Sequence, residues 1–116
     1  MLHRVLIVDD DQLIRNGLAT LLEKDGHEAI TAETVTEGLD KLSSWPTHVL
    51  LDTYLPDGVG TMVLRHIRTK KMPIKVAVLS ESLNTELIAE AHALQADAVF
   101  RKPEEWNALL DWLATA

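Results

Sequence analysis

The chain has 116 residues, of which 47% are apolar and only 4% aromatic, and its formal net charge is −7. A chain of this length is typical of one domain, which we expect to cover residues 1–116. The acidic balance argues against direct nucleic-acid binding, and the absence of cysteine excludes disulfides and thiolate metal sites. No apolar run is long enough for a signal peptide or a membrane span, so we predict a cytoplasmic protein without membrane contact.

Short apolar runs alternate with stretches of helical periodicity along the whole chain. The helix that follows the first strand ends at Gly26, and a capping box from Thr34 to Glu37 opens the second helix, which ends before Pro46. Residues 56–60, rich in proline and glycine, predict a loop. The pattern predicts strands near residues 3–9, 28–32, 47–52, 76–79 and 97–101, and further helices near 12–25, 60–70, 84–94 and 104–114.

This alternation of strands and helices predicts a parallel sheet with helices on both faces. Ligands bind to such folds at the carboxyl ends of the strands. Acids, a hydroxyl and an ammonium group follow the predicted strands at these ends, and we expect them to converge on one rim. They are Asp9, Asp10, Asp52, Ser80 and Lys102.

The convergence of carboxylates sets a charge problem at this rim. At a separation of about 4 Å and an effective dielectric near 20, each like-charge pair costs roughly 4 kcal/mol. Lys102 and one divalent cation would neutralise the three aspartates Asp9, Asp10 and Asp52. A hard cation with oxygen ligands is therefore predicted at this site.

With these motifs, including the run from Leu51 to Gly60 (LDTYLPDGVG) and the pair Lys102–Pro103, the whole chain resembles the receiver domain of bacterial two-component response regulators. The resemblance implies a flavodoxin-like, doubly wound, five-stranded parallel sheet of order 2-1-3-4-5 in a three-layer α/β/α fold. It also implies a cytoplasmic signalling switch that catalyses only its own phosphorylation and dephosphorylation.

The resemblance implies a role for each rim residue. Asp52 would accept a phosphoryl group from a histidine kinase or a histidine phosphotransfer protein. Asp9, Asp10, Asp52 and the backbone carbonyl of Tyr54 would hold Mg²⁺ or Mn²⁺, while Ser80 and Lys102 would bind the phosphoryl oxygens. The Lys102–Pro103 bond would be cis. The output surface would be the fourth helix, fifth strand and fifth helix, where a homodimer could also form.

The sequence departs from the family pattern at positions that modulate this chemistry. Val99 stands where the family usually has the aromatic that moves during switching, and Phe100 should point to the opposite face of its strand. Glu81 stands where a small residue is common, and we predict that its carboxylate slows phosphorylation by small anionic donors. Tyr54 and Ser82 occupy positions that tune the lifetime of the phosphoryl group.

Several residues have structural interpretations. Asp11 is predicted to cap a helix, Asp57 to serve turn chemistry, and Trp106 to lie in the core. Trp112 is open between edge packing and a partner-binding face. The five histidines show no i+3 or i+4 spacing and are interpreted as ordinary surface or boundary residues: His3, His27, His48, His66 and His92.

Three other functions stay open beside the phosphorylated switch. A pseudo-receiver, an interaction module without phosphorylation or without the aromatic switch, is slightly favoured by Val99 and Glu81. It is disfavoured by the intact set of Asp9, Asp10, Asp52, Ser80 and Lys102. A metal-dependent phosphohydrolase lacks a second aspartate two residues after Asp52. A flavodoxin-like nucleotide or flavin binder is disfavoured because the acidic first loop would repel phosphate and no glycine-rich loop is present.

Overall fold

The computed structural model describes residues 2–81, 85–102 and 104–116, and its centre is a five-stranded sheet. All neighbouring strands are parallel, in the order β2-β1-β3-β6-β7. This order is the predicted 2-1-3-4-5 arrangement, because β6 and β7 are the fourth and fifth strands of the sheet. The strands are β1 (Arg4–Val8), β2 (Glu28–Ala32), β3 (His48–Asp52), β6 (Lys75–Ser80) and β7 (Ala98–Arg101).

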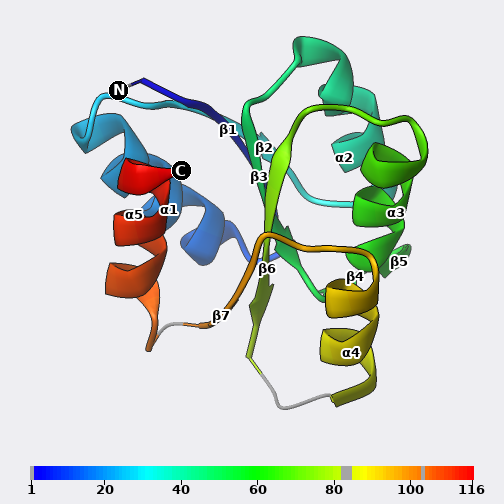
Figure 1. Cartoon of the computed structure of the whole chain (residues 1–116). Coiled ribbons are helices and arrows are strands. Elements are labelled where there is room, and N and C mark those ends of the chain that lie inside the picture. The colour runs from blue at the N-terminus through cyan, green and yellow to red at the C-terminus, as the bar shows by residue number, and fades with distance from the viewer. Residues whose placement is uncertain (1, 82–84, 103) are drawn as a thin grey trace.

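Helices cover both faces of the sheet and give the predicted three layers (Figure 1). One face carries α1 (Gln12–Lys24) and α5 (Trp106–Thr115). The other carries α2 (Val35–Lys41), extended by the 3₁₀ turn η1 (Leu42–Ser44), together with α3 (Thr61–Thr69) and α4 (Thr85–Ala93). No helix within the described ranges is long and apolar enough to cross a bilayer.

The helix ends follow from local sequence chemistry. The Asp11 carboxylate accepts hydrogen bonds from the backbone N–H groups of Leu13 (2.9 Å) and Ile14 (3.3 Å), which confirms its predicted capping role. Thr34 Oγ1 accepts from the Glu37 N–H at 3.0 Å, as the capping box predicts. Beyond α1, Gly26 adopts a φ of 88°, a left-handed conformation that ends the helix at little cost for glycine.

Alternate strand residues bury two separate aliphatic clusters. Leu6, Val8 and Leu51 belong to the cluster beneath α2, α3 and α4, whereas Val5 and Ile7 belong to the one beneath α1 and α5. Every residue of β1 from Val5 onward is fully buried, as expected for a central parallel strand covered on both faces. The sheet is therefore a rigid platform for the side chains that follow its strands.

The segment between β3 and α3 differs from the predicted loop. It contains a short antiparallel hairpin, in which β4 (Tyr54–Leu55) pairs with β5 (Gly58–Val59). The tip of this hairpin is formed by Pro56 and Asp57. Pro56 and Asp57 form the turn, as the sequence predicts, but strands of two residues are too short to produce a periodic signal.

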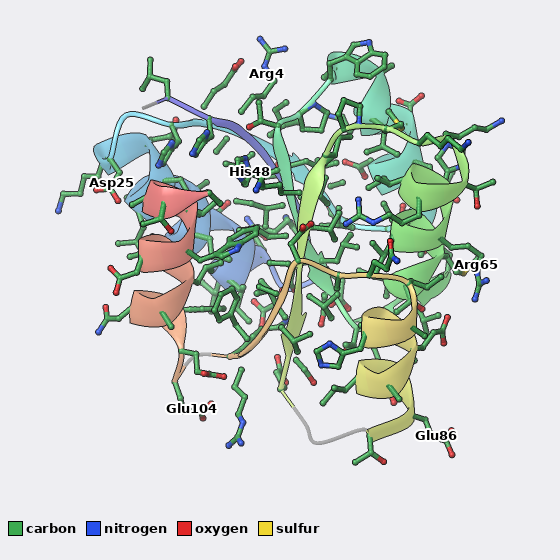
Figure 2. All side chains as sticks on the ribbon, in the orientation of Figure 1. Arg4, Asp25, His48, Arg65, Glu86 and Glu104 are labelled. Atoms are coloured by element: carbon green, nitrogen blue, oxygen red, sulfur yellow. The ribbon has the colours of Figure 1, made fainter. Side chains whose placement is uncertain are left out.

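Three histidines gather at the amino end of the sheet, so their interpretation as surface or boundary residues is wrong. His3, His27 and His48 are at most 9% exposed, and the His3 ring lies 5.0 Å from that of His27 and 4.2 Å from that of His48. Figure 2 shows His48 inside the molecule, in contrast to the peripheral Arg65 and Glu86. His3, His27 and His48 meet because each lies at the start of one of the adjacent strands β1, β2 and β3.

Hydrogen bonds fix the orientation of the three rings in this histidine cluster. His3 Nε2 donates to the Leu113 carbonyl oxygen (2.8 Å), and the His3 backbone N–H donates to His27 Nδ1 (3.1 Å). Thr47 Oγ1 gives its proton to the Arg4 carbonyl, so His48 Nδ1 acts as a donor to that hydroxyl at 2.8 Å. His48 Nε2 is then a buried acceptor without a hydrogen-bond partner among the described residues. Burial and the neighbouring His3 lower the pKa of His48 to about 4.

Candidate functional site

The carboxyl ends of β1, β3 and β6 bring the predicted acids and hydroxyl to one rim of the sheet. Val8 pairs with Leu51 and Leu79 pairs with Asp52, so Asp9 and Asp52 leave neighbouring strands at the same level. Ser80 ends β6 one residue beyond the level of Asp52 and is buried. The sheet register, which places side chains from distant parts of the chain side by side, therefore builds the site.

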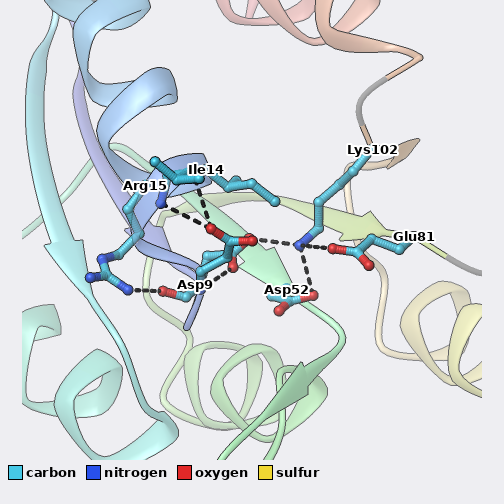
Figure 3. Close-up of polar contacts among 8 residues, drawn as sticks. Asp9, Ile14, Arg15, Asp52, Glu81 and Lys102 are labelled. Carbon is cyan, nitrogen blue, oxygen red and sulfur yellow. Dashed lines mark hydrogen bonds and ion pairs between the residues drawn. The ribbon is translucent and has the colours of Figure 1, made fainter.

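Lys102 links the two buried aspartates of this rim (Figure 3). Its Nζ lies 2.6 Å from Asp9 Oδ2 and 3.0 Å from Asp52 Oδ1, and its side chain is 2% exposed. The Lys102 backbone N–H donates to the Ser80 carbonyl at 2.9 Å, which ties the end of β7 to the end of β6. Burial alone would lower the pKa of Lys102, but the hydrogen bond that its ammonium group donates to Asp9 and the negative charge of Asp52 outweigh burial and raise that pKa. Lys102 is therefore held as a cation.

Asp9 is completely buried and is held at both oxygens. Its Oδ1 accepts from the Asp11 backbone N–H at 2.9 Å, and its Oδ2 accepts from Lys102. A carboxylate with two oxygens has about four acceptor positions, so each oxygen keeps a lone pair for another ligand. Asp10, the next residue, is exposed and lines a surface pocket beside Asp52.

Asp52 is the buried acid whose charge is least compensated. Burial raises its pKa to about 6, the negative charge of Asp9 adds to the rise, and Lys102 only partly opposes both. The carboxylate faces a pocket of about 250 Å³ lined by Asp10, Asp52, Thr53, Tyr54 and Glu81. A buried acid with a perturbed pKa at the floor of an open pocket is typical of a functional group.

Glu81 brings a fourth carboxylate to the mouth of this pocket. Its Oε1 lies 3.8 Å from Lys102 Nζ, and its side chain is 67% exposed. The residue therefore reaches toward the same ammonium group that binds Asp9 and Asp52 (Figure 3). A negative charge at this position repels any anionic ligand that enters the pocket.

Val99 and Trp112, predicted as a modulating and an interface residue, do not line the pocket. Val99 packs against the cluster beneath α2, α3 and α4, and Phe100 packs against the opposite cluster, as the strand alternation predicted. Trp112 is half-buried and packs edge-on against His48 (5.5 Å) and Phe100 (6.1 Å), far along the sheet from the pocket. A partner-binding role for Trp112 stays a prediction. Ser82 and Pro103 lie outside the described residues.

The sequence reading missed one residue next to the site. Arg15 is buried, and its Nη1 donates to the Asp9 backbone carbonyl at 2.8 Å (Figure 3). Its Nη2 also lies 3.6 Å from Glu33. The sequence does contain a sign of this role, because Arg15 shares the buried stripe of α1 with Leu18 and Leu22. A cation on an apolar stripe indicates a buried partner.

The acids of the site suit a hard divalent cation. One carboxylate oxygen from each of Asp9, Asp10 and Asp52 lies within 4.8 Å of the others, and this is the only such acid or histidine group among the residues that the structure describes. An all-oxygen donor set is typical of Mg²⁺ or Mn²⁺. Lys102 supplies one positive charge against three acidic side chains, and the pKa of Asp52 is raised first by burial and then by the negative charges of Asp9 and Asp10. The residues present therefore fit the predicted cation.

Comparisons with known proteins agree with this geometry. Residues 5–114 match the response regulator receiver domain family. The KDP operon transcriptional regulatory protein KdpE of Escherichia coli is 37% identical over 100 residues, which cover 85% of this chain and 44% of KdpE. The phosphate regulon transcriptional regulatory protein PhoB of Escherichia coli is 29% identical over 106 residues, which cover 89% of this chain and 46% of PhoB. The chain thus spans about half the length of the curated relatives it matches.

A solved structure gives the same result for the fold. The receiver domain protein (CheY-like) of Methanospirillum hungatei JF-1 superposes with a TM-score of 0.91 and 31% identity, over 99% of this chain and 93% of that one. The chain belongs to the response regulator receiver domain family. Members of this family are signalling modules, and the fold is the flavodoxin-like arrangement predicted from the sequence.

Proposed function

We propose that this receiver domain accepts a phosphoryl group on Asp52 from a histidine kinase or a histidine phosphotransfer protein, in a reaction that depends on Mg²⁺ or Mn²⁺. The observation that carries the proposal is the Lys102 ammonium group. It joins Asp9 and Asp52 at 2.6 and 3.0 Å, and Asp52 lines an open acidic pocket. Phosphoryl transfer needs chiefly positioning and neutralisation of spread negative charge.

In the proposed reaction, a carboxylate oxygen of Asp52 attacks the phosphorus atom of a phosphohistidine. A P–O bond forms while the P–N bond breaks, and the donor imidazole leaves with the electron pair of that bond. Lys102 then exchanges the Asp52 carboxylate for a phosphoryl oxygen, and the Ser80 hydroxyl donates to another. Asp9, Asp10, Asp52 and the Tyr54 carbonyl would hold the cation, and when bound it would neutralise charge on the phosphoryl oxygens.

The proposed output follows from the position of Lys102. The residue lies between the end of β7 and the start of α5, and its backbone is bonded to Ser80 on β6. A displacement of Lys102 and Ser80 toward a phosphoryl group would therefore pull on both strands. The surface formed by α4, β7 and α5 is the proposed site of output and of homodimer formation. A cytoplasmic location, without membrane or nucleic-acid contact, belongs to the same proposal.

Phosphorylation of purified protein tests this function. The chain is incubated with a panel of phosphorylated histidine kinases and phosphotransfer proteins, with Mg²⁺ or with EDTA, and the modified residue is mapped by mass spectrometry. We expect a labile acyl phosphate on Asp52 that needs the cation and is lost in Asp52→Asn. Asp11→Asn is the matched control, because asparagine also caps helices and the acceptor stays intact.

The same experiment decides the main alternative. A pseudo-receiver, which binds partners without phosphorylation, is favoured by the Glu81 carboxylate at 3.8 Å from Lys102 and by an aliphatic residue at Val99. It predicts that no donor modifies Asp52 in either metal condition. That result, with a folded protein, would replace the phosphorylated switch by the interaction module.

A further inference from the structure

The hairpin between β3 and α3 carries Tyr54, whose backbone carbonyl is a proposed ligand of the cation. Tyr54 pairs with Val59 and Leu55 pairs with Gly58, so only Pro56 and Asp57 form the tip. The hairpin is too short to be stable alone, because isolated two-stranded hairpins of any length are marginal in water. Its position depends on the contacts that it makes with the rest of the domain.

Contacts at the base fix one end of the hairpin against the phosphoacceptor. The Gly60 N–H donates to the Thr53 carbonyl at 3.0 Å. A Cβ atom at Gly60 would overlap the backbone oxygen of Asp52, so no other residue fits at this position without displacement of the chain. The base of the hairpin therefore rests directly on the peptide of Asp52.

A carboxylate at the tip fixes the other end. Asp57 Oδ1 accepts from the Val35 backbone N–H at 2.7 Å, and Oδ2 accepts from the Thr36 N–H at 3.0 Å and from Thr36 Oγ1 at 2.8 Å. These hydrogen bonds lower the pKa of Asp57, the Thr36 N–H contributing most. The prediction that Asp57 serves turn chemistry was therefore incomplete, because its side chain contacts another element.

The N–H groups of the first turn of α2 show how specific this contact is. A helix start leaves several N–H groups without partners in the helix. The Thr34 hydroxyl accepts a hydrogen bond from the Glu37 N–H. The N–H groups of Val35 and Thr36 are instead bound by Asp57, which lies 22 residues from Val35 in sequence. The tip of the hairpin thus completes the cap of a helix from another part of the chain. Loss of the carboxylate would free both the helix start and the hairpin.

We propose that Asp57 is a positioning residue for the cation site, because it holds the Tyr54 hairpin between the start of α2 and the backbone of Asp52. The inference rests on the proposed function, since it assumes that the cation binds beside Tyr54. Asp57 itself is not a ligand in this scheme. Its oxygens face α2, and it is not among the three aspartates whose oxygens converge.

Metal affinity and stability, measured on the same variants, separate positioning from a general structural role. Free Mn²⁺ is followed by electron paramagnetic resonance, and unfolding by urea is followed in EDTA. We expect Asp57→Ala to weaken Mn²⁺ binding about tenfold, the loss found when residues that orient metal ligands are removed. Asp57→Asn, which keeps one acceptor oxygen, should lose less affinity.

Asp97→Asn is the matched control. Asp97 Oδ2 also accepts a backbone N–H, that of Val76 at 2.7 Å, and the guanidinium of Arg68 at 2.9 Å, but at the other end of β6. This variant should lower the urea midpoint while leaving the Mn²⁺ affinity unchanged. If Asp57→Ala fails to fold, Thr36→Val removes the hydroxyl donor alone and should weaken Mn²⁺ binding in the same direction by a smaller factor.

The outcomes distinguish this inference from the proposed function. Wild-type protein that binds Mn²⁺, together with Asp57→Ala of unchanged affinity, overturns the positioning role alone. A wild-type protein that binds no Mn²⁺ overturns the cation site and the positioning role together. Weaker Mn²⁺ binding in Asp57→Ala, with wild-type affinity in Asp97→Asn, supports both.

Discussion

The two ends of the sheet bury ionisable side chains in opposite ways. At the carboxyl end, the cationic Lys102 lies 2.6 Å from Asp9 and 3.0 Å from Asp52, so one buried ammonium group joins two buried acids. At the amino end, burial lowers the pKa of both His27 and His48 and so disfavours their protonated forms. The carboxyl end therefore buries a cation between two acids, whereas the amino end disfavours positive charge on two of its three histidines.

The difference has a consequence for the pH dependence of stability. The Asp52 pKa is raised to about 6 in the folded state, so the folded protein holds that proton more tightly than the unfolded chain does. The His48 pKa is lowered to about 4, so the unfolded chain takes up that proton first. As the pH falls through the acidic range, protonation of Asp52 therefore raises the free energy of unfolding, whereas protonation of His48 lowers it. Variants at each end should separate the two contributions, and the largest effect is expected where a buried pair is broken.

Removal of the ammonium group at the carboxyl end should be the most damaging change. Lys102→Met leaves Asp9 and Asp52 without their cation, and breaking a buried ion pair from one side costs about 3–5 kcal/mol. We expect a loss of this size in the free energy of urea unfolding, measured in EDTA at pH 7. Lys70→Met, at an exposed lysine, should have little effect.

A second substitution sharpens this prediction. Lys102→Met combined with Asp52→Asn should recover part of the lost stability, because one of the two stranded charges is removed. A double variant as unstable as Lys102→Met alone would show that the ammonium group acts through packing rather than through charge.

Acid should destabilise the amino end through His48. Its pKa falls from 6.5 in the unfolded chain to about 4 in the folded state. Its contribution is present above pH 6.5 and is lost as the pH falls toward 4. The shift corresponds to roughly 3 kcal/mol over that range. His3, His27 and Lys75 disfavour the proton, and Asp97 favours it.

The measurement is urea unfolding across this pH range in EDTA. His48→Leu should flatten the acid side of the profile, and at pH 7 it should cost only the hydrogen bond from Nδ1 to Thr47, since the buried Nε2 has no partner among the described residues. His92→Gln, on the exposed face of α4, should leave the profile unchanged. An unaltered acid slope in His48→Leu would contradict the assignment to this histidine.

Asp52→Asn should have the opposite effect at the carboxyl end. The Asp52 pKa of about 6, against 3.8 in the unfolded chain, means that stability is lost as the pH rises between these values. In EDTA at pH 7 the variant should therefore be more stable than the wild type by about 1–3 kcal/mol. Differential scanning calorimetry at pH 4 and pH 7 tests this, since the gain should be absent at pH 4. A loss at pH 7 would mean that the hydrogen bond from Lys102 outweighs the burial of charge.

The smallest expected effect is at the mouth of the pocket. Glu81→Ala removes an exposed carboxylate near Lys102 and should speed phosphorylation by acetyl phosphate about two- to threefold, because an anionic donor meets less repulsion. The rate is followed by phosphoprotein gel or mass spectrometry, with Glu86→Ala as the control at a comparable exposed acid. An unchanged rate in Glu81→Ala would refute a gating role.

Much of this fold could be predicted because its signals are local. The five alternating units, the cap at Asp11, the capping box at Thr34 and the stop at Gly26 each depend on a few neighbouring residues. The rim could also be predicted, since parallel strands place their carboxyl ends together. Arg15 was not predicted, although it lies on the buried stripe of α1. Apolar periodicity leaves out a cation whose partner, the Asp9 carbonyl, comes from another element.

The sequence by itself determined the alternation of strands and helices and the acids that follow the first and third strands, because backbone propensity and strand direction act over short distances. Only the tertiary structure decided that Lys102 joins Asp9 to Asp52, that Asp57 completes the cap of α2, and that three histidines from separate strands become buried neighbours. The physical reason is that burial and hydrogen-bond partners belong to the packed sheet. The ionisation of a side chain follows those surroundings and cannot be assigned from its position in the chain.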